Sequence, residues 1–220
     1  MRKFDTPTPI TAVVDVPTGR VQIIAADRAD TVVEVLPMNA SKSRDVKAAE
    51  QATVECGDGV LRIDVPVKNQ YIGASGSVEV TVRVPTGSRV EGKAGATEFR
   101  GVGRLGDVVF DGAYRQIKID EAASVQLTAH EGTVEVGRLS GPAEITTQRG
   151  DIRITEAMGG TVTLRTQQGD ISVGAARGVS ASLDAGTPYG RISNALRNDG
   201  TITLDIRATT SHGDITAHSL

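Results

Sequence analysis

The sequence predicts an all-β protein, a β-solenoid-like stack of parallel two-strand rungs with an N-terminal β-rich segment that carries one short helix. Three observations favour this fold class. Apolar and polar residues alternate along most of the chain, as in half-buried strands. In the second half a glycine-centred motif recurs about every 20 residues, the size of one solenoid turn. Aromatic residues make up only 3% of the 220 residues, and a narrow interior accommodates Ile, Val, Leu and Ala more easily than large rings.

The N-terminal segment, residues 1–87, is expected to be β-rich and to cap one end of the stack. Residues 41–53 predict its short helix, because they begin with serine, contain good helix formers and place Val46 and Ala49 on one face. Elsewhere in the segment, short alternating runs are separated by turns rich in Pro and Gly. The pattern leaves open whether this segment is a separate domain or continues the sheets of the repeat.

The second part, residues 88–220, is predicted to be a β-strand repeat of about seven rungs. Each rung consists of two short strands separated by a tight turn, and the turn glycines are Gly132, Gly150, Gly169, Gly190 and Gly213. Apolar residues stand seven and five positions before each glycine and two positions after it. The residue three positions before the glycine is mostly threonine. One rung cannot bury both of its faces, so the rungs must stack with like residues above like. The last rung ends at Leu220 without a visible cap, which would leave its strand edges exposed.

Composition and charge limit the class of function. The chain has 24 Lys and Arg residues and 27 Asp and Glu residues, which give a net charge of -3. It therefore lacks the excess of basic residues that nucleic-acid binding requires. The single cysteine, Cys56, excludes an internal disulfide framework and a cysteine-based zinc site. The first residues lack the apolar core of a secretory signal, and no stretch is long and apolar enough to span a bilayer. We therefore expect a cytoplasmic protein that does not insert into membranes.

The repeat also carries a family resemblance. The motifs RGDI, QGDI and HGDI, the entry VPTGSRVEGKAG and the closing ATTSHGDITAHSL resemble the putative-adhesin, β-strand-repeat family of bacterial proteins of unknown function. The resemblance covers essentially the whole chain. It implies a β-solenoid-like fold, and it implies no catalytic residue that could be carried over.

Asp151 and Asp170 follow the turn glycines of adjacent rungs, and Asp214 follows that of the last. A column of carboxylates could bind a cation, but stacked rungs place like residues about 5 Å apart, where like charges repel. We therefore interpret these aspartates as turn caps that accept backbone N–H bonds. We expect no metal and no cofactor. His130 and His212 occupy neighbouring repeat positions about four rungs apart, too distant to share a metal.

Tyr189 and Arg191 break the repeat consensus on either side of Gly190. Departures from a repeat can mark a functional site. They can also mark a longer turn, and the insertion ALRNDG at 195–200 follows this rung. These two residues, with Asp151 and Asp170, are the site candidates.

Three functions fit this pattern. The leading one is a non-enzymatic cytoplasmic scaffold or protein-interaction module built on the solenoid, with an unknown protein or itself as partner. The second is a homo-oligomer that assembles through its terminal strands. The third is an enzyme or binding protein that acts on a carbohydrate or small molecule along one solenoid face, with Asp151 and Asp170 as its acids. No nucleophile elbow, phosphate loop or zinc-protease motif supports the enzyme.

Overall fold

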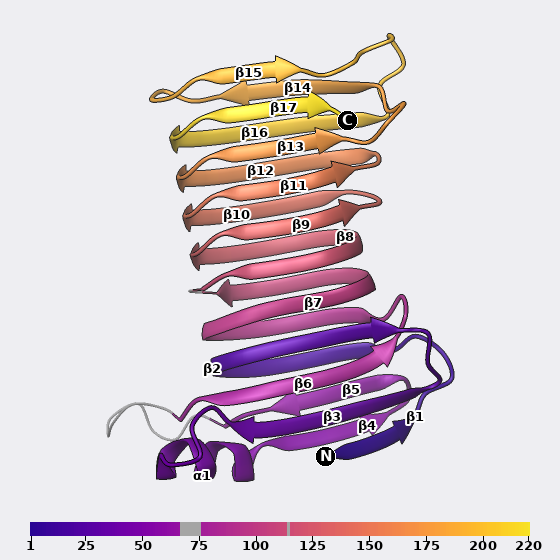
Figure 1. The fold of residues 1–220 in the computed structure, drawn as a ribbon, viewed down its shortest axis with the longest axis vertical. Helices are drawn as coiled ribbons and strands as arrows, with labels where there is room; N and C mark the ends of the chain where they lie inside the picture. The colour runs from indigo at the N-terminus through magenta and orange to yellow at the C-terminus, as the bar shows by residue number, and fades with distance from the viewer. Residues whose placement is uncertain (67–75, 114) are drawn as a thin grey trace.

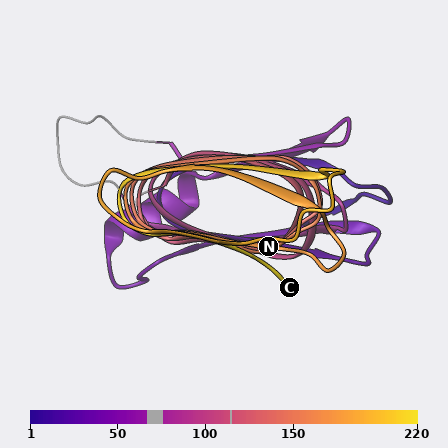
Figure 2. The same ribbon diagram turned by 90° about the horizontal axis from the view of Figure 1, so that it is seen from above.

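The computed structural model describes residues 1–66, 76–113 and 115–220, which form one long stack of strands (Figure 1). Seen along the stack, the chain winds as a flattened tube with a layer of strands on each side of a narrow interior (Figure 2). All the strands in these three ranges belong to one 17-stranded sheet. The predicted fold class, a β-solenoid-like stack with one helix among the described residues, is confirmed.

The chain begins with an N-terminal group of elements. They are β1 (Arg2–Asp5), β2 (Thr11–Ala26), β3 (Asp30–Pro37), α1 (Ser43–Gln51), β4 (Thr53–Gly57), β5 (Val60–Asp64) and β6 (Val78–Pro85). The repeat follows with the strands β7 (Arg89–Ala113), β8 (Ile117–Glu131), β9 (Val134–Leu139), β10 (Ala143–Arg149), β11 (Ile152–Ala157), β12 (Gly160–Gln168), β13 (Ile171–Ala175), β14 (Ala181–Gly186), β15 (Ile192–Ala195), β16 (Leu204–His212) and β17 (Ile215–Ser219). Strands β7 and β8 bend around corners and contribute to both layers, whereas the strands from β9 onward alternate between the layers.

The repeat positions identified in the sequence lie directly beside one another in parallel register. In one layer, Ile152 lies between Val134 and Ile171. In the other, Ile145 lies between Leu127 and Leu164. These side chains are buried, so they form apolar ladders that run along the inside of the stack. Each rung is therefore stable only because its neighbours cover it.

At the C-terminal end, the order of the rungs in space differs from their order in the chain. Strands β12 and β13 pair with β16 and β17, and β14 and β15 pair on the far side of that last rung. Figure 1 shows the yellow C-terminal strands enclosed below the orange β14 and β15. The expectation that the chain's last rung ends the stack is therefore wrong. The long connection after β15, at 196–203, lets the chain return one level and insert.

The N-terminal strand β2 is itself a rung, which the sequence pattern did not reveal. It pairs with β7 along both of its halves, and on its other side with β5 and then β6. It turns its corner at Gly19, where a Cβ would lie 1.9 Å from the Val78 carbonyl oxygen. Residues 1–87 and the repeat thus share one continuous sheet.

Antiparallel strands and the helix close the N-terminal end of the stack. Three antiparallel pairings extend the sheet here: β4 pairs with β5, β3 pairs with β6, and β1 pairs with β3. Nη1 of Arg2 on β1 donates to the Val54 carbonyl oxygen on β4 at 2.6 Å, so this bond joins the two edge strands. The helix α1 packs against β3 and β6 (Figure 1). We call this arrangement of β1, β4 and α1 the closed end.

The helix is shorter than the predicted range of 41–53. It runs from Ser43 to Gln51, and Lys42 at its N-cap makes no side-chain capping bond. Ala48 and Ala49 pack against the core from partly buried positions. Its one buried residue is Asp45, whose Oδ1 accepts a hydrogen bond from the backbone N–H of Ser77 at 3.0 Å. The helix is therefore held by this buried acceptor as well as by its apolar face.

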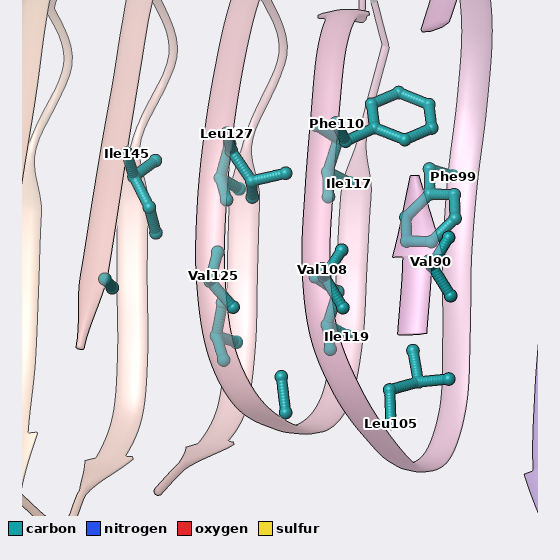
Figure 3. Close-up of a cluster of buried hydrophobic side chains, with 14 of the residues drawn as sticks. Val90, Phe99, Leu105, Val108, Phe110, Ile117, Ile119, Val125, Leu127 and Ile145 are labelled. Carbon is teal, nitrogen blue, oxygen red and sulfur yellow. The ribbon is translucent and has the colours of Figure 1, made fainter. Parts of the chain in front are cut away.

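The interior accommodates an aromatic pair near the middle of the chain. The rings of Phe99 and Phe110 have centroids 4.7 Å apart, and both are buried. Figure 3 shows them pointing into the tube among Val90, Leu105 and Ile117. Room for Phe110 comes from Gly92, where a Cβ would lie 2.3 Å from the ring. The scarcity of aromatics thus reflects a narrow interior in which a large ring requires a glycine beside it.

Ion pairs between neighbouring rungs line the outside of the stack. Examples are Arg100–Asp120 at 2.7 Å, Lys118–Glu135 at 3.1 Å and Arg138–Glu156 at 2.8 Å. Such exposed pairs each contribute little to stability. They do show that charges of opposite sign are matched across rungs.

Asp15 on β2 is an exception, because it lies directly beside Asp64 on β5. Partial burial first, and then the Asp64 carboxylate, raise the pKa of Asp15, while Lys93 on its other side lowers it. A raised folded-state pKa means that the folded protein disfavours the ionised form. Stability is therefore lost as the pH rises through the titration of Asp15.

We predict that Asp15→Asn raises the melting temperature at neutral pH and that the gain disappears at a pH acidic enough to protonate Asp15. The gain should stay below about 1 kcal/mol, because Asp15 is exposed and water screens the repulsion. Thermal unfolding followed by circular dichroism across this pH range measures it. Asp27→Asn, on an exposed turn, is the control, and equal effects of the two substitutions would contradict the prediction.

Candidate functional site at the open end

The corner glycines are required by the close approach of successive rungs. A Cβ on Gly150 would lie 2.2 Å from the Gly132 carbonyl oxygen, and one on Gly169 equally close to that of Gly150. At Gly213 the corresponding distance, to Gly169, is 2.1 Å. These glycines also have positive φ angles, 137° at Gly150 and 148° at Gly169, which other residues rarely adopt. The predicted turn glycines thus form one continuous column.

Threonine hydroxyls satisfy the carbonyl groups of this column. Thr166 Oγ1 donates to the Gly150 carbonyl at 3.1 Å, and Thr210 Oγ1 to the Gly169 carbonyl at 3.0 Å. In the end rung, Thr187 Oγ1 donates to Gly213 in the same way. Thr166, Thr187 and Thr210 are therefore structural residues that link one corner to the next.

The aspartates that follow the glycines form a second ladder. Asp151 Oδ1 accepts the backbone N–H of Asp170, and Asp170 Oδ1 accepts that of Asp214, both at 2.8 Å. Each carboxylate thus binds the backbone of the neighbouring rung rather than that of its own turn. Among the described residues, no group of three or more His, Cys, Asp and Glu side chains could hold a metal ion.

Arg191 is the end of this ladder, at the outermost rung. Its backbone N–H donates to Asp214 Oδ1 at 2.9 Å, and its Nη2 lies 3.1 Å from Asp214 Oδ2. These two interactions, the backbone hydrogen bond first, lower the pKa of Asp214. The arginine that breaks the sequence consensus therefore neutralises the last carboxylate of the column, and its side chain is 90% exposed.

Tyr189 lies at the same corner, and its ring stacks on His212 of the neighbouring rung. Its ring lies parallel to that of His212, with centroids 4.9 Å apart and planes 7° apart, and Tyr189 is 68% exposed. His130 and His212 line one shallow hollow of about 390 Å³ that runs along the corner. His130 lies on β8 and His212 on β16, and the strands β10 and β12 lie between these two. The two histidines are therefore three rung steps apart.

The structure separates the four predicted site residues into two groups. Asp151 and Asp170 lie within the stack, where their carboxylates hold the corner. Tyr189 and Arg191 lie together at its end, on the rung β14–β15.

The rung β14–β15 leaves one side of the stack open. Strand β14 pairs only with β16, and β15 only with β17, among the strands of the described residues. The interior columns end here, so Leu183 and Ala185 are only partly buried and Ile192 is 48% exposed. We call this surface, made of Leu183, Ala185, Tyr189, Arg191, Ile192 and Asn194, the open end.

The connection after β15 covers one corner of the open end. The Ala181 backbone N–H donates to the Arg197 carbonyl at 3.0 Å, and the Asp199 N–H donates to Ser180 Oγ at 3.1 Å. Residues 196–199 therefore fold over the start of β14. The half of the rung nearer to Gly190 has no such cover from the described residues.

This geometry defines a class, an elongated β-solenoid with one closed and one open end and with corners built from Gly, Thr and Asp ladders. The family model described as Toastrack DUF4097 matches residues 13–219. The chain therefore belongs to this family, and the resemblance inferred from the repeat motifs is confirmed. No curated protein is significantly similar to it.

Several solved structures are similar to this chain at low sequence identity. A putative adhesin from Bacteroides fragilis is 13% identical, with a TM-score of 0.54 over 98% of this chain and 95% of its own. A putative lipid binding protein from Parabacteroides distasonis is 14% identical, with a TM-score of 0.49 over 97% and 95%. A putative cell adhesion protein from Clostridium sporogenes is 10% identical, with a TM-score of 0.41 over 100% and 98%. The likeness to the Bacteroides fragilis structure concerns the fold alone.

Sequence reasoning missed the open end itself. Ile192 stands in the same repeat position as the buried Ile152 and Ile171, so its column alone predicts burial. The available signal was the insertion at 195–200, which lengthens the last repeat spacing and allows the final rung to fold back.

We predict that Gly169→Ala destabilises the protein much more than Gly178→Ala does. Both glycines have positive φ, but a Cβ at 178 meets nothing within 4 Å, so the cost there is only the roughly 1–2 kcal/mol of a left-handed alanine. At 169 the clash with the Gly150 carbonyl adds a further ~1–3 kcal/mol. Urea unfolding of both variants measures the difference. Equal losses would show that the rungs do not approach closely at the corner.

Proposed function

We propose that the protein is a non-enzymatic interaction module that docks a protein partner on its open end. The observation that carries the proposal is the asymmetry of the two ends. At the closed end, the free strand edges among the described residues belong to β1 and β4, which carry charged residues and are joined by the bond from Arg2 to Val54. The open end instead exposes Tyr189 and Ile192 beside the free edges of β14 and β15. Unpaired strand edges are templates for pairing with another chain.

The composition of the open end supports a protein as the partner. Tyrosine and arginine are among the residues most enriched at the energetic centres of protein interfaces. Here Tyr189 is held by its stacking on His212, and Arg191 by its bond to Asp214. Both side chains are thus ordered before a partner arrives, which lowers the entropy cost of binding.

The enzyme alternative has less support. Its two acids, Asp151 and Asp170, each accept a backbone hydrogen bond in the corner ladder. A catalytic carboxylate requires an arrangement directed at a substrate, whereas these two hold neighbouring rungs together. The scaffold role therefore remains the better proposal for this fold.

A cytoplasmic location is part of the same proposal. Its support is the single thiol, Cys56, which is free and partly buried and suits a reducing compartment. Among the described residues, no helix is long and apolar enough to cross a membrane.

Site-specific photo-crosslinking tests the proposal. Benzoylphenylalanine replaces Ser193 on the open end in one variant, and Glu55 on the closed end in the matched control, in cells that naturally produce the protein. We predict polypeptide adducts from position 193, identified by mass spectrometry, and few from position 55. No adduct at position 193, or equal adducts at both positions, would contradict docking at the open end.

A further inference from the structure

We infer that the partner at the open end is a second copy of this chain, and that the two copies form a closed two-fold dimer, end to end. This inference rests on the proposed function and names its partner. It follows from the shape, the symmetry and the charges of the open end, and from the closure of the opposite end.

The shape of the open end restricts what can cover it. It presents two free strand edges, β14 and β15, one from each layer, with the ends of the apolar columns between them. A single added strand would pair with one edge and leave the other edge and the interior exposed. A complete cover needs two edges at the same separation with apolar side chains between them, which the same rung of a second copy supplies.

The directions of the two strands also suit a two-fold axis. The chain runs toward the Gly190 corner in β14 and away from it in β15, since the two are successive strands of one rung. An axis along the rung exchanges the two layers, so β14 of one copy runs antiparallel to β15 of the other. Both pairs of edges then join at once, with Leu183 and Ala185 facing Ile192 and Asn194 of the second copy.

The outward charges favour this axis. Asp184 on β14 is exposed, and Arg191 precedes β15. Pairing β14 with β15 of the second copy places these opposite charges at diagonal positions on neighbouring strands, where long side chains can interact. Pairing β14 with itself would instead place the two Asp184 carboxylates near each other.

The closed end limits assembly to two copies. Within the described ranges, its edge strands β1 and β4 each pair on one side only, but the bond from Arg2 to Val54 joins them. Both strands are short and carry charged residues, which disfavours pairing with another chain. An isologous contact between open ends uses the single open surface of each copy and leaves none for a third. The assembly therefore stops at a dimer instead of growing into a filament.

The contact is small, so the dimer should dissociate on dilution. Strand β14 has six residues and β15 four, so the rung spans roughly 20 Å, and its two layers lie about 10 Å apart. The buried area is thus smaller than that of standard-size interfaces, as in weak or transient contacts. A wide concentration range is needed to observe it.

Sedimentation velocity from dilute solution to about 1 mM, where a weak dimer would still form, is the experiment. We expect a monomer–dimer equilibrium with no larger species. Ile192→Asp should weaken dimerisation at least tenfold, and circular dichroism should show an unchanged fold, because Ile192 is already half-exposed. Glu55→Lys at the closed end is the matched control and should leave the equilibrium unchanged.

Removal of one charge tests the geometry. Around the proposed axis, Asp184→Asn removes an attraction to Arg191 of the second copy and should weaken the dimer. Around the alternative axis, which would pair β14 with itself, the same substitution removes the repulsion between the two Asp184 carboxylates, so a strengthened dimer would overturn the proposed axis.

The remaining outcomes separate the two proposals. A monomer at every concentration, or species larger than a dimer, overturns the dimer. If position 193 nevertheless crosslinks to a different polypeptide, docking at the open end stands without it. If position 193 yields no adduct in cells and the protein stays monomeric, both proposals fail.

Discussion

The close stacking of successive corners at the turn glycines is the constraint on which the rest of the structure depends. At Gly150, Gly169 and Gly213 the backbone passes so near the carbonyl of the neighbouring rung that no side chain fits. This approach sets the register, and the register places each apolar residue beside its equivalent. It also brings the threonine hydroxyls and aspartate carboxylates to the backbone groups that a corner would otherwise leave unpaired. Buried polar groups without partners would make such a corner costly.

The threading of the chain decides where the molecule can interact. Both terminal rungs lie inside the stack, β2 between β7 and the pair β5–β6, and β16–β17 between two earlier rungs. The exposed edges among the described residues belong to β1 and β4 at the closed end and to β14 and β15 at the open end. The closed-end edges carry charged residues and are joined by the bond from Arg2 to Val54, whereas β14 and β15 border exposed apolar side chains. We propose a function at the open end because no further rung of the described chain pairs with β14 and β15 there.

The sequence predicted the repeat well, because stacking requires the same residue type at the same position in every rung. The columns that contain Ile145 and Ile152, and the corner glycines, could be identified without a structure. The order of the rungs could not, because a rung at the edge and a rung in the middle carry the same pattern. Ile192 and Ile171 occupy one column, yet they differ in exposure. Tyr189 and Arg191 were recognisable as departures, but only the structure shows that they share the open end.

Hydrogen exchange of backbone amides in dilute solution tests the order of the rungs most directly. If β16 and β17 are inserted, their amides should exchange as slowly as those of β12 and β13, while the amides of β14 and β15 should exchange fastest among the repeat strands. If the rungs instead stacked in chain order, β14 and β15 would be protected and the last strands, β16 and β17, would exchange rapidly. That result would contradict both the insertion and the location of the open end.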